Sequence, residues 1–377
     1  MDSITKFLKS KNSSISENST LKSSFSGTAA GVGAIPLVGA IDITAKLDNV
    51  IEDVIDQSKI LVTGCSGFIG FHVAKYLLEQ GFSVVGIDNM NKYYSKQLKE
   101  SRTKLLKQHK NFKFYEEDIC NYNFLTKLAK KHEFKDIIHL AAQPGVRYSI
   151  ENPFEYERSN VQGHLNILEL CRNIKNFNKL VYASSSSVYG NNKKLPFSTH
   201  DRTDEPISLY AATKKANELM SYTYAHLYGI NSIGLRFFTV YGPYGRPDMA
   251  PFKFTKNIFE EKPIDVYNMG NMKRDFTYIN DVVYGVMGAL KSSFIGHKVY
   301  NLGNSKAEDL KEFIRVIEEC VGKKAIINYQ PMQPGDVEET FADISEAKQD
   351  LGFIPATDIY TGIPLFVDWY KEYYLAK

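Results

Sequence analysis

The sequence predicts an α/β fold, a doubly wound parallel sheet joined to a smaller C-terminal part. Three observations lead to this prediction. A short apolar strand runs into a glycine-rich turn and a helical pattern, similar strand and helix units recur along the chain, and past Thr239 this rhythm loosens as glycines, prolines and aromatic residues become more frequent. At roughly 150 residues per domain, 377 residues are enough for two structural units.

The first strand, turn and helix open the regular part of the chain. Ser58–Gly64 is a short apolar, β-branched run, as expected of a buried parallel strand. A glycine-rich segment over residues 64–70 follows, then a helical pattern at Phe71–Gln80 and a second strand at Phe82–Ile87 that ends at Asp88. Together these segments form the β–turn–α–β–acid unit typical of a dinucleotide-binding site.

Three glycines of this turn have separate roles in the predicted site. Gly64 permits the tight turn, Gly67 lets the backbone approach a pyrophosphate, and Gly70 lets the helix pack closely on the strand. The helix N-terminus adds N–H donors and the positive end of its dipole. Asp88 is expected to accept hydrogen bonds from the adenosine ribose and to repel a 2′-phosphate, and Asn89 rather than an arginine follows it. NAD is therefore predicted rather than NADP.

The strand pattern recurs four more times. These strands are predicted at Phe112–Tyr115, Asp136–Leu140, Lys179–Ser184 and Ile233–Phe237, with helical stretches between them. The domain prediction is a cofactor-binding part over residues 58–238 and a mainly substrate-binding part over residues 239–377, with some segments of the latter returning to the first.

Residues 1–57 are predicted to be a partly disordered N-terminal extension. Its apolar stretch, Ala29–Ile43, is short and interrupted by Pro36 and Asp42, so it predicts neither a membrane span nor an ordinary signal peptide. A short helix is expected near Ala45–Ile55. Contact of the apolar stretch with a membrane surface or partner is one alternative, and packing onto the main body or disorder is the other.

Composition excludes several classes of function. The 46 Lys and Arg against 43 Asp and Glu give a net charge of +3, which gives no support to nucleic-acid binding. The four cysteines have no C-x-x-C spacing, and the eight histidines show no ligand spacing, so no metal site and no disulfide scaffold are predicted. A reducing compartment, the cytoplasm, is the expected location.

Two features carry the chemistry. The run Ser184-Ser185-Ser186-Ser187-Val188-Tyr189-Gly190 follows a predicted strand, at the sheet edge where ligands bind. Tyr210 stands twenty-five residues after Ser185, and Lys214 stands four residues later, on the same helix face. A nearby ammonium lowers a phenol pKa, which suits Tyr210 to take a proton from a sugar hydroxyl. The alternative is an ordinary surface Tyr/Lys pair.

At these residues the chain resembles an extended short-chain dehydrogenase/reductase with a Rossmann domain, of the NAD-dependent epimerase/dehydratase family. Within that family it is most similar to the UDP-glucuronate 4-epimerases. The resemblance runs from about Lys59 to Lys377 and rests on the segments LVTGCSGFIG, HLAAQPGVRYSIENP, YASSSSVYG, YAATKKANE, GRPDMAPFKFTK, KRDFTYINDV and MQPGDVEETFAD. GRPDMAPFKFT, together with the unbroken SSSSVYG, is the more specific part.

The resemblance implies a reaction and a catalytic set. Bound NAD⁺ oxidises C4 of the sugar, the 4-keto sugar turns over in the pocket, and the hydride returns to the opposite face. Tyr210 is the implied base, Lys214 tunes it and contacts the nicotinamide ribose, and Ser185 relays the proton, although another serine of the run could do so. Ser186 and Ser187 stand where dehydratases and decarboxylases of the family carry acids. Epimerisation alone is therefore expected.

The remaining site predictions concern ligand contacts. The predicted cofactor-binding residues are Gly64, Gly67, Phe68, Ile69, Gly70, Asp88, Asn89, Asp118, Ile119, Leu140, Ala141, Ala142, Gln143, Asn160, Tyr210, Lys214 and Phe237, and the predicted substrate-binding residues are Ser185, Ser186, Thr239, Arg246 and Arg274. Arg246 is the candidate for a sugar carboxylate, which a guanidinium binds bidentately. The alternative is a loop arginine tied to a neighbouring Asp. The family implies Arg274 for the diphosphate.

Three functions are compatible with these features. The first is a UDP-glucuronate 4-epimerase that forms UDP-galacturonate. The second is an epimerase of UDP-glucose or UDP-N-acetylglucosamine, or a dehydrogenase with net oxidation. The third is a non-catalytic NAD-binding protein, against which the presence of Ser185, Tyr210 and Lys214 argues. By analogy with the family, helices near Phe154–Cys171 and Leu209–Tyr228 are expected to pair across a homodimer.

Overall fold

The computed structural model describes residues 59–332 and 337–376. The predicted extension, residues 1–57, lies outside the described residues, as do residues 333–336. The prediction for the extension stays a prediction.

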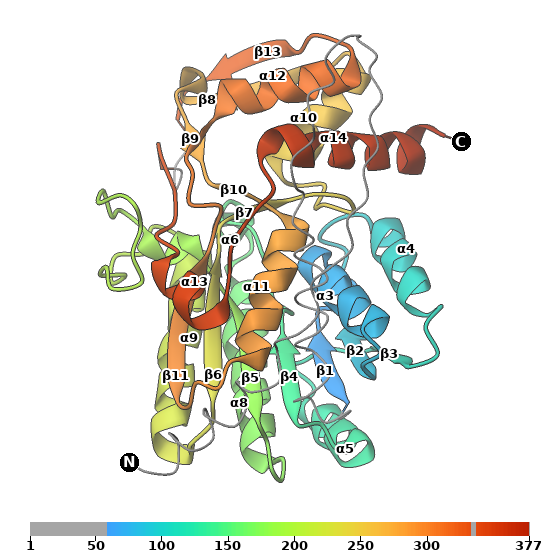
Figure 1. Cartoon of the computed structure of the whole chain (residues 1–377), viewed down its shortest axis with the longest axis vertical. Coiled ribbons are helices and arrows are strands. Elements are labelled where there is room, and N and C mark those ends of the chain that lie inside the picture. Colours follow the sequence, from blue (N-terminus) through green and yellow to red (C-terminus); the bar gives the residue numbers. More distant parts are fainter. Residues whose placement is uncertain (1–58, 333–336, 377) are drawn as a thin grey trace, which may run out of the picture. The chain divides into compact units, whose positions relative to one another are not determined.

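A seven-stranded parallel sheet forms the centre of the fold (Figure 1). Its order is β11-β6-β5-β4-β1-β2-β3, with strands β1 (Ile60–Thr63), β2 (Val84–Asp88), β3 (Phe112–Glu116), β4 (Asp136–His139), β5 (Lys179–Ser185), β6 (Ser232–Phe237) and β11 (His297–Leu302). The predicted doubly wound parallel sheet is confirmed. Because β1 and β4 are neighbours while their crossovers run in opposite directions, the ligand crevice opens beyond the carboxyl ends of these two strands.

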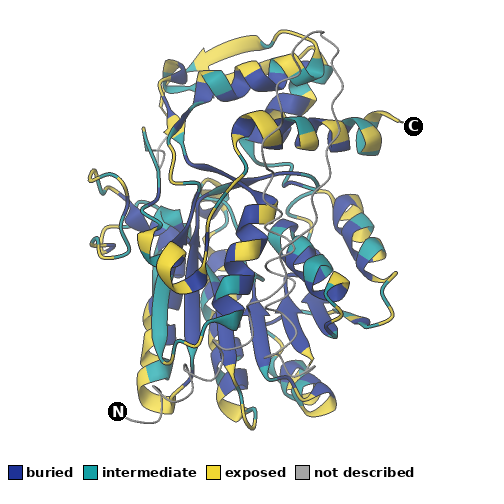
Figure 2. Ribbon diagram, viewed as in Figure 1, coloured by how far each residue is buried: buried dark blue, intermediate teal, exposed yellow. Residues whose placement is uncertain are grey.

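Helices cover both faces of the sheet (Figure 1). Their bounds are α3 (Phe68–Glu79), α4 (Lys96–Leu106), α5 (Tyr122–His132), α6 (Tyr148–Glu151), α7 (Pro153–Tyr156), α8 (Gly163–Asn173), α9 (Leu209–Tyr228), α11 (Ile279–Lys291) and α13 (Ser345–Leu351), with a π-helical turn at Glu157–Gln162. Leu61, Ile137 and Leu180 of the strands pack against Leu125 of α5 and Ile167 of α8 in one fully buried cluster. The strands are accordingly buried along most of their length (Figure 2).

The C-terminal part lies beyond the carboxyl ends of the strands, at the top of Figure 1. It consists of α10 (Ala250–Phe259), α12 (Leu310–Val321) and α14 (Ile359–Tyr370), with the paired strands β7 (Thr239–Tyr241) and β10 (Phe276–Tyr278), β9 (Lys273–Arg274) and β12 (Glu308–Asp309), and β8 (Pro263–Tyr267) and β13 (Ile326–Gln330). Aromatic packing holds it together: the Phe276 and Phe313 rings stack with centroids 3.9 Å apart. The division into two domains stays a prediction.

A buried ion pair between β6 and α9 holds the end of β5, the strand that leads into the serine run. Arg236 of β6 donates to both carboxylate oxygens of Glu218 on α9, at 2.8 Å each, and both side chains are 4% exposed. Glu218 also accepts from the Ser184 hydroxyl at 2.6 Å, and Arg236 donates to the Tyr189 hydroxyl at 3.0 Å. Although burial raises the pKa of Glu218, Arg236 outweighs it and holds this pKa below its usual value.

Glu218→Ala is expected to lower the free energy of unfolding by about 3–5 kcal/mol, because it leaves the Arg236 guanidinium buried without its carboxylate. Urea denaturation measures this change. Glu79→Ala is the matched control, since it removes an exposed ion pair with Lys75 and should cost less than about 0.5 kcal/mol. Equal losses in the two variants would contradict a structural role for the buried pair.

Candidate active site

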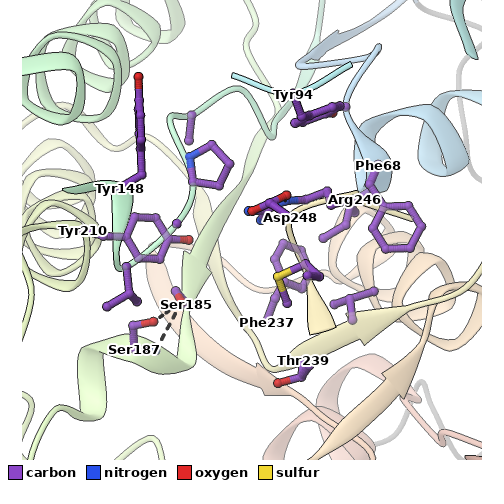
Figure 3. Close-up of a pocket in the computed structure, with 18 of the residues that line it drawn as sticks. Phe68, Tyr94, Tyr148, Ser185, Ser187, Tyr210, Phe237, Thr239, Arg246 and Asp248 are labelled. Carbon is purple, nitrogen blue, oxygen red and sulfur yellow. Dashed lines mark hydrogen bonds and ion pairs between the residues drawn. The ribbon is translucent and has the colours of Figure 1, made fainter. Parts of the chain in front are cut away.

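A cavity of about 1100 Å³ opens where the strand ends face the C-terminal part. The glycine-rich turn after β1, the ends of β4 and β5, the start of α9 and the loop before α10 all line it. Ser185, Ser187, Tyr210, Thr239 and Arg246 lie around this one cavity in Figure 3. Segments distant in the sequence thus meet at the sheet edge where open α/β folds bind ligands.

The glycine-rich turn has the shape that a dinucleotide needs. Gly64 adopts a φ of +71°, and a Cβ there would lie 2.7 Å from the Ala141 nitrogen. A Cβ at Gly70 would collide with the Gly64 carbonyl oxygen, so α3 can pack this closely only with glycine. The helix begins at Phe68, three residues earlier than predicted. Its N-cap is Gly67, which has no side chain to cap the first N–H groups. Its first N–H groups are therefore available to a phosphate.

The acid after β2 lies where the prediction requires. Asp88 lines the cavity, and its two oxygens accept from the Ser66 amide at 3.1 Å and the Met90 amide at 2.9 Å. Asn89 donates to Asp118 at 3.2 Å, which brings both predicted residues to one end of the cavity. Lys99 of α4, which the sequence reasoning missed, also lines this end, and its ammonium donates to the Asn91 carbonyl at 3.0 Å.

Gln143 and Asn160 differ from the other predicted cofactor residues, because they are 3% and 2% exposed and do not line the cavity. The Asn160 oxygen accepts from the Gln143 amide at 2.7 Å, and its nitrogen donates to the Gln143 carbonyl at 3.0 Å and the Thr213 hydroxyl at 3.1 Å. Asn160 therefore fastens the segment after β4 to α9.

All other predicted site residues line the cavity. They are Gly64, Gly67, Phe68, Ile69, Gly70, Asp88, Asn89, Asp118, Ile119, Leu140, Ala141, Ala142, Ser185, Ser186, Tyr210, Lys214, Phe237, Thr239, Arg246 and Arg274.

The serine run continues β5 into a short 3₁₀ helix, Ser186–Tyr189. The Ser185 hydroxyl donates to the Ser187 hydroxyl at 3.0 Å and accepts from the Ser187 amide at 3.2 Å (Figure 3). Tyr210 and Lys214 lie in the first two turns of α9, which Ser208 caps by accepting from the Ala211 amide. The Lys214 ammonium donates to the Ala183 carbonyl at 2.8 Å, so it is held against β5.

Burial and two neighbouring groups act on the pKa of Tyr210. Burial raises the pKa of Tyr210, while the Ser185 hydroxyl and the charge of Arg246 lower it. Arg246 is thus a cation that favours the Tyr210 phenolate, from a loop distant in the sequence. Burial lowers the pKa of Lys214 to about 8. The role of Lys214 in tuning Tyr210 stays a prediction.

Arg246 is paired with a carboxylate of its own loop. Its Nε lies 3.1 Å from Asp248 Oδ1 and its Nη2 2.5 Å from Asp248 Oδ2. Arg246 is therefore tied to a neighbouring Asp, as the alternative prediction had it. Both side chains nevertheless line the cavity. Arg274 also lines the cavity, and its guanidinium donates to the carbonyls of Lys273 at 2.8 Å and Glu338 at 3.0 Å.

Sequence reasoning missed several cavity residues besides Lys99. Tyr93, Arg147 and Asp248 line the cavity, but none lies in a motif whose spacing alone predicts a ligand contact. Asp248 is two residues after Arg246 in the segment GRPDMAPFKFTK, and Arg147 lies in HLAAQPGVRYSIENP, so the family resemblance was the signal that could have found both. Among the described residues, no group of three or more His, Cys, Asp or Glu side chains is arranged to hold a metal ion.

Known proteins share this sequence and fold. The Staphylococcus aureus protein CapI is 51% identical over 84% of this chain and 99% of its own length. UDP-glucuronate 4-epimerase 4 of Arabidopsis thaliana is 47% identical over 84% of this chain and 76% of its own length. The crystal structure of UDP-glucuronic acid 4-epimerase from Bacillus cereus, in complex with UDP-glucuronic acid and NAD, matches 84% of this chain and 100% of that chain, with a TM-score of 0.79 and 36% identity.

A family model provides the last comparison. The model described as GDP-mannose 4,6 dehydratase matches residues 61–365, which include the strand ends, the serine run and the Tyr210–Lys214 pair. The resemblance predicted from the motifs is thereby confirmed. The chain belongs to the GDP-mannose 4,6 dehydratase family of NAD-dependent epimerases and dehydratases.

Proposed function

We propose that this chain is an NAD-dependent UDP-glucuronate 4-epimerase, an isomerase that interconverts UDP-glucuronate and UDP-galacturonate. The observation that carries the proposal is the arrangement of one cavity, in which Ser185, Tyr210 and Lys214 lie at the end of β5 and the start of α9 while Arg246 lines the same space. Relatives 46% to 47% identical carry the name UDP-glucuronate 4-epimerase.

The glycine-rich turn and Asp88 are the proposed holders of NAD, through the α3 N-terminus and the ribose hydroxyls. When bound, NAD⁺ would supply the acceptor for the C4 hydride and, once reduced, the donor that returns it. Tyr210 accepts the proton of the O4 hydroxyl as C4 is oxidised, and it returns the proton to O4 after the sugar has turned over. The Ser185 hydroxyl shares this proton, and Lys214 holds the nicotinamide end from its place against Ala183.

The Lys and Arg side chains that line the cavity suit a substrate with two phosphates and a carboxylate. The cavity is lined by Arg147, which follows β4, and by four cations of the C-terminal part, Arg246, Lys253, Lys256 and Arg274. Arg274 is the proposed diphosphate contact and Arg246 the proposed carboxylate contact, with Ser186 and Thr239 beside the sugar. Ser186 and Ser187 supply no carboxylate for elimination or decarboxylation, so the reaction ends with epimerisation.

Turnover without net redox change tests this function. The purified protein is expected to retain NAD(H) and to convert UDP-glucuronate to UDP-galacturonate, as resolved by NMR, with no reductant added. The absorbance at 340 nm should show no stoichiometric NADH, because the hydride leaves and returns. UDP-glucose and UDP-N-acetylglucosamine are the comparison substrates. Stoichiometric NADH accumulation from UDP-glucuronate would indicate a dehydrogenase, and faster conversion of a neutral sugar would indicate a different epimerase.

A homodimer is the proposed assembly, formed through the outer faces of α7, α8 and α9. These faces expose large apolar side chains, Phe154 (83%), Leu165 (40%) and Leu219 (57%) among them. Such side chains stay in water unless a second surface covers them. Light scattering after gel filtration should give twice the chain mass for the wild type and the monomer mass for Leu219→Glu. A wild-type monomer would refute the assembly.

A cytoplasmic location is also proposed. Cys65, Cys120, Cys171 and Cys320 are all free thiols, which suits a reducing compartment. Along the part of the chain that the structure describes, every helix is too short or too polar to cross a bilayer.

A further inference from the structure

Arg102 of α4 is a fully buried arginine that joins two segments bordering the cavity. Its Nη1 donates to the carbonyl of Ser66, in the glycine-rich turn, at 2.9 Å. Its Nη2 donates to the carbonyls of Tyr244 at 2.6 Å and Gly245 at 3.4 Å, the two residues before Arg246. One guanidinium therefore connects the proposed cofactor turn to the loop that carries the proposed carboxylate contact.

The acceptors around Arg102 are neutral. Nη1 also donates to the Tyr94 hydroxyl at 2.7 Å, so these four acceptors are one hydroxyl and three backbone carbonyls. Nε is buried and has no hydrogen-bond partner among the described residues. A buried charge without a carboxylate partner is costly, so this arginine is a poor choice for stability alone. What it provides is a planar set of donors that holds separate segments at fixed distances.

The loop that carries the proposed carboxylate contact has a backbone that needs support. Tyr244 adopts a φ of +57°, in the left-handed region that bulky residues rarely occupy. His72 of α3 donates from Nε2 to the Pro243 carbonyl at 2.9 Å. Three consecutive carbonyls, those of residues 243–245, are thus held by side chains of α3 and α4. Removal of the Arg102 guanidinium frees two of the three.

Arg246 follows the held carbonyls directly. In Figure 3 its side chain lies across the cavity from Tyr210, and Asp248 engages its Nε and Nη2 at 3.1 and 2.5 Å. The end formed by Nη1 and Nη2 can still take a second carboxylate bidentately. Both hydrogen bonds form together only while the backbone at Arg246 keeps its place, because each needs its donor and acceptor within about 3.2 Å.

We propose that Arg102 is a positioning residue, which fixes the loop of Arg246 against the cofactor turn and so sets the preference of the cavity for a uronate over a neutral hexose. The inference rests on the proposed function, in which Arg246 binds the sugar carboxylate. A neutral hexose has no carboxylate for Arg246, so its binding depends less on where the loop lies. Loss of Arg102 therefore affects the two kinds of substrate unequally.

The test compares two substrates in variants of Arg102. Arg102→Met removes every donor and fills the same space with an unbranched side chain. With NAD in excess, it is expected to lower the ratio of kcat/KM for UDP-glucuronate to that for UDP-glucose about 5- to 10-fold, part of the loss expected of a charge-assisted hydrogen bond. The loss should appear in KM rather than kcat, because the hydrogen bonds of Arg102 do not reach Tyr210 or Lys214.

Three comparisons separate positioning from charge and from stability. Arg102→Lys should restore less than half of the lost ratio, since one ammonium keeps the charge but cannot span both segments. Leu128→Ala opens a hole in the buried cluster beneath α5, and it should lower Tm without changing the ratio. In an Arg246→Ala background, Arg102→Met should change the ratio less than about 2-fold, because the two residues act as one unit. Arg102→Gln replaces Arg102→Met if the latter does not fold.

Three results would overturn the inference. An equal loss for both sugars would make Arg102 a purely structural residue. Full recovery in Arg102→Lys would assign the effect to charge, and a loss that persists without Arg246 would assign it to another part of the cavity. Conversion of UDP-glucuronate by the wild type is measured on the same preparation. Absence of that turnover would refute the proposed function, and calorimetric affinities of the two nucleotide sugars would then test the positioning role by the same ratio.

Discussion

Tyr210→Phe is expected to lower kcat for UDP-glucuronate epimerisation by about 10²–10⁴-fold, the usual effect of losing a positioned acid or base. The phenol is the group proposed to exchange a proton with O4, and a phenylalanine ring keeps the packing while removing the oxygen. Tyr210 packs edge-on against Tyr156, with ring centroids 6.0 Å apart, and this contact needs no hydroxyl. Initial rates from an NMR time course measure the change.

The variant should still bind NAD, because the glycine-rich turn and Asp88 are untouched. Retained cofactor, released by heat and quantified, is therefore the control for folding. Ser185→Ala should reduce kcat less than Tyr210→Phe, since Ser187 lies 3.0 Å from the Ser185 hydroxyl and can hold the sugar oxygen in its place. A Tyr210→Phe enzyme within tenfold of the wild type would remove Tyr210 from the catalytic role.

Local sequence signals were sufficient where the backbone itself dictates the structure. The turn at Gly64 requires a positive φ and the close approach of Ala141, and both requirements appear in the sequence as glycine spacing after a β-branched run. The helix expected near Leu209–Tyr228, by analogy with the family rather than from a local signal, is present over those residues. Six of the seven sheet strands were predicted, because buried parallel strands appear in a sequence as short apolar runs.

Sequence patterns were not sufficient to predict the structure where segments distant in the sequence meet. The strand β11, His297–Leu302, joins the sheet beside β6 only after the whole α11 crossover, and its first three residues are half-buried, so no continuous apolar run marks it. Asn160, whose cofactor contact stays a prediction, has Gln143 and Thr213 as hydrogen-bond partners. The packing that buries Asn160 depends on contacts across more than fifty residues, which a linear pattern does not encode.

The same limit applies to the electrostatics of the catalytic pair. Spacing of four residues correctly indicates that Tyr210 and Lys214 share a helix face, and both line the cavity. Spacing does not indicate that the Ala183 carbonyl binds the ammonium, or that Arg246 contributes to the Tyr210 pKa from another loop. Those facts depend on where β5 and the loop before α10 lie relative to α9.

Arg246→Ala is expected to lower the ratio of kcat/KM for UDP-glucuronate to that for UDP-glucose by about 10- to 100-fold, because a charge-assisted hydrogen bond contributes roughly 1.5–3 kcal/mol. The expected loss has a second source in this structure. Without the guanidinium, Asp248 stays in the cavity wall as a carboxylate without its 2.5 Å partner and repels the incoming uronate. Steady-state kinetics with the two substrates measure the ratio.

Two matched variants locate the effect. Arg246→Lys should recover only part of the ratio, since an ammonium keeps the charge but loses the planar fork. Arg274→Ala should weaken both substrates alike, because both contain the UDP diphosphate that Arg274 is proposed to bind. If Arg246→Ala instead lowers kcat/KM equally for the two sugars, Arg246 does not bind the sugar carboxylate. The preference for glucuronate would then have to come from the serine run, where Ser186 and Ser187 are the next groups to replace.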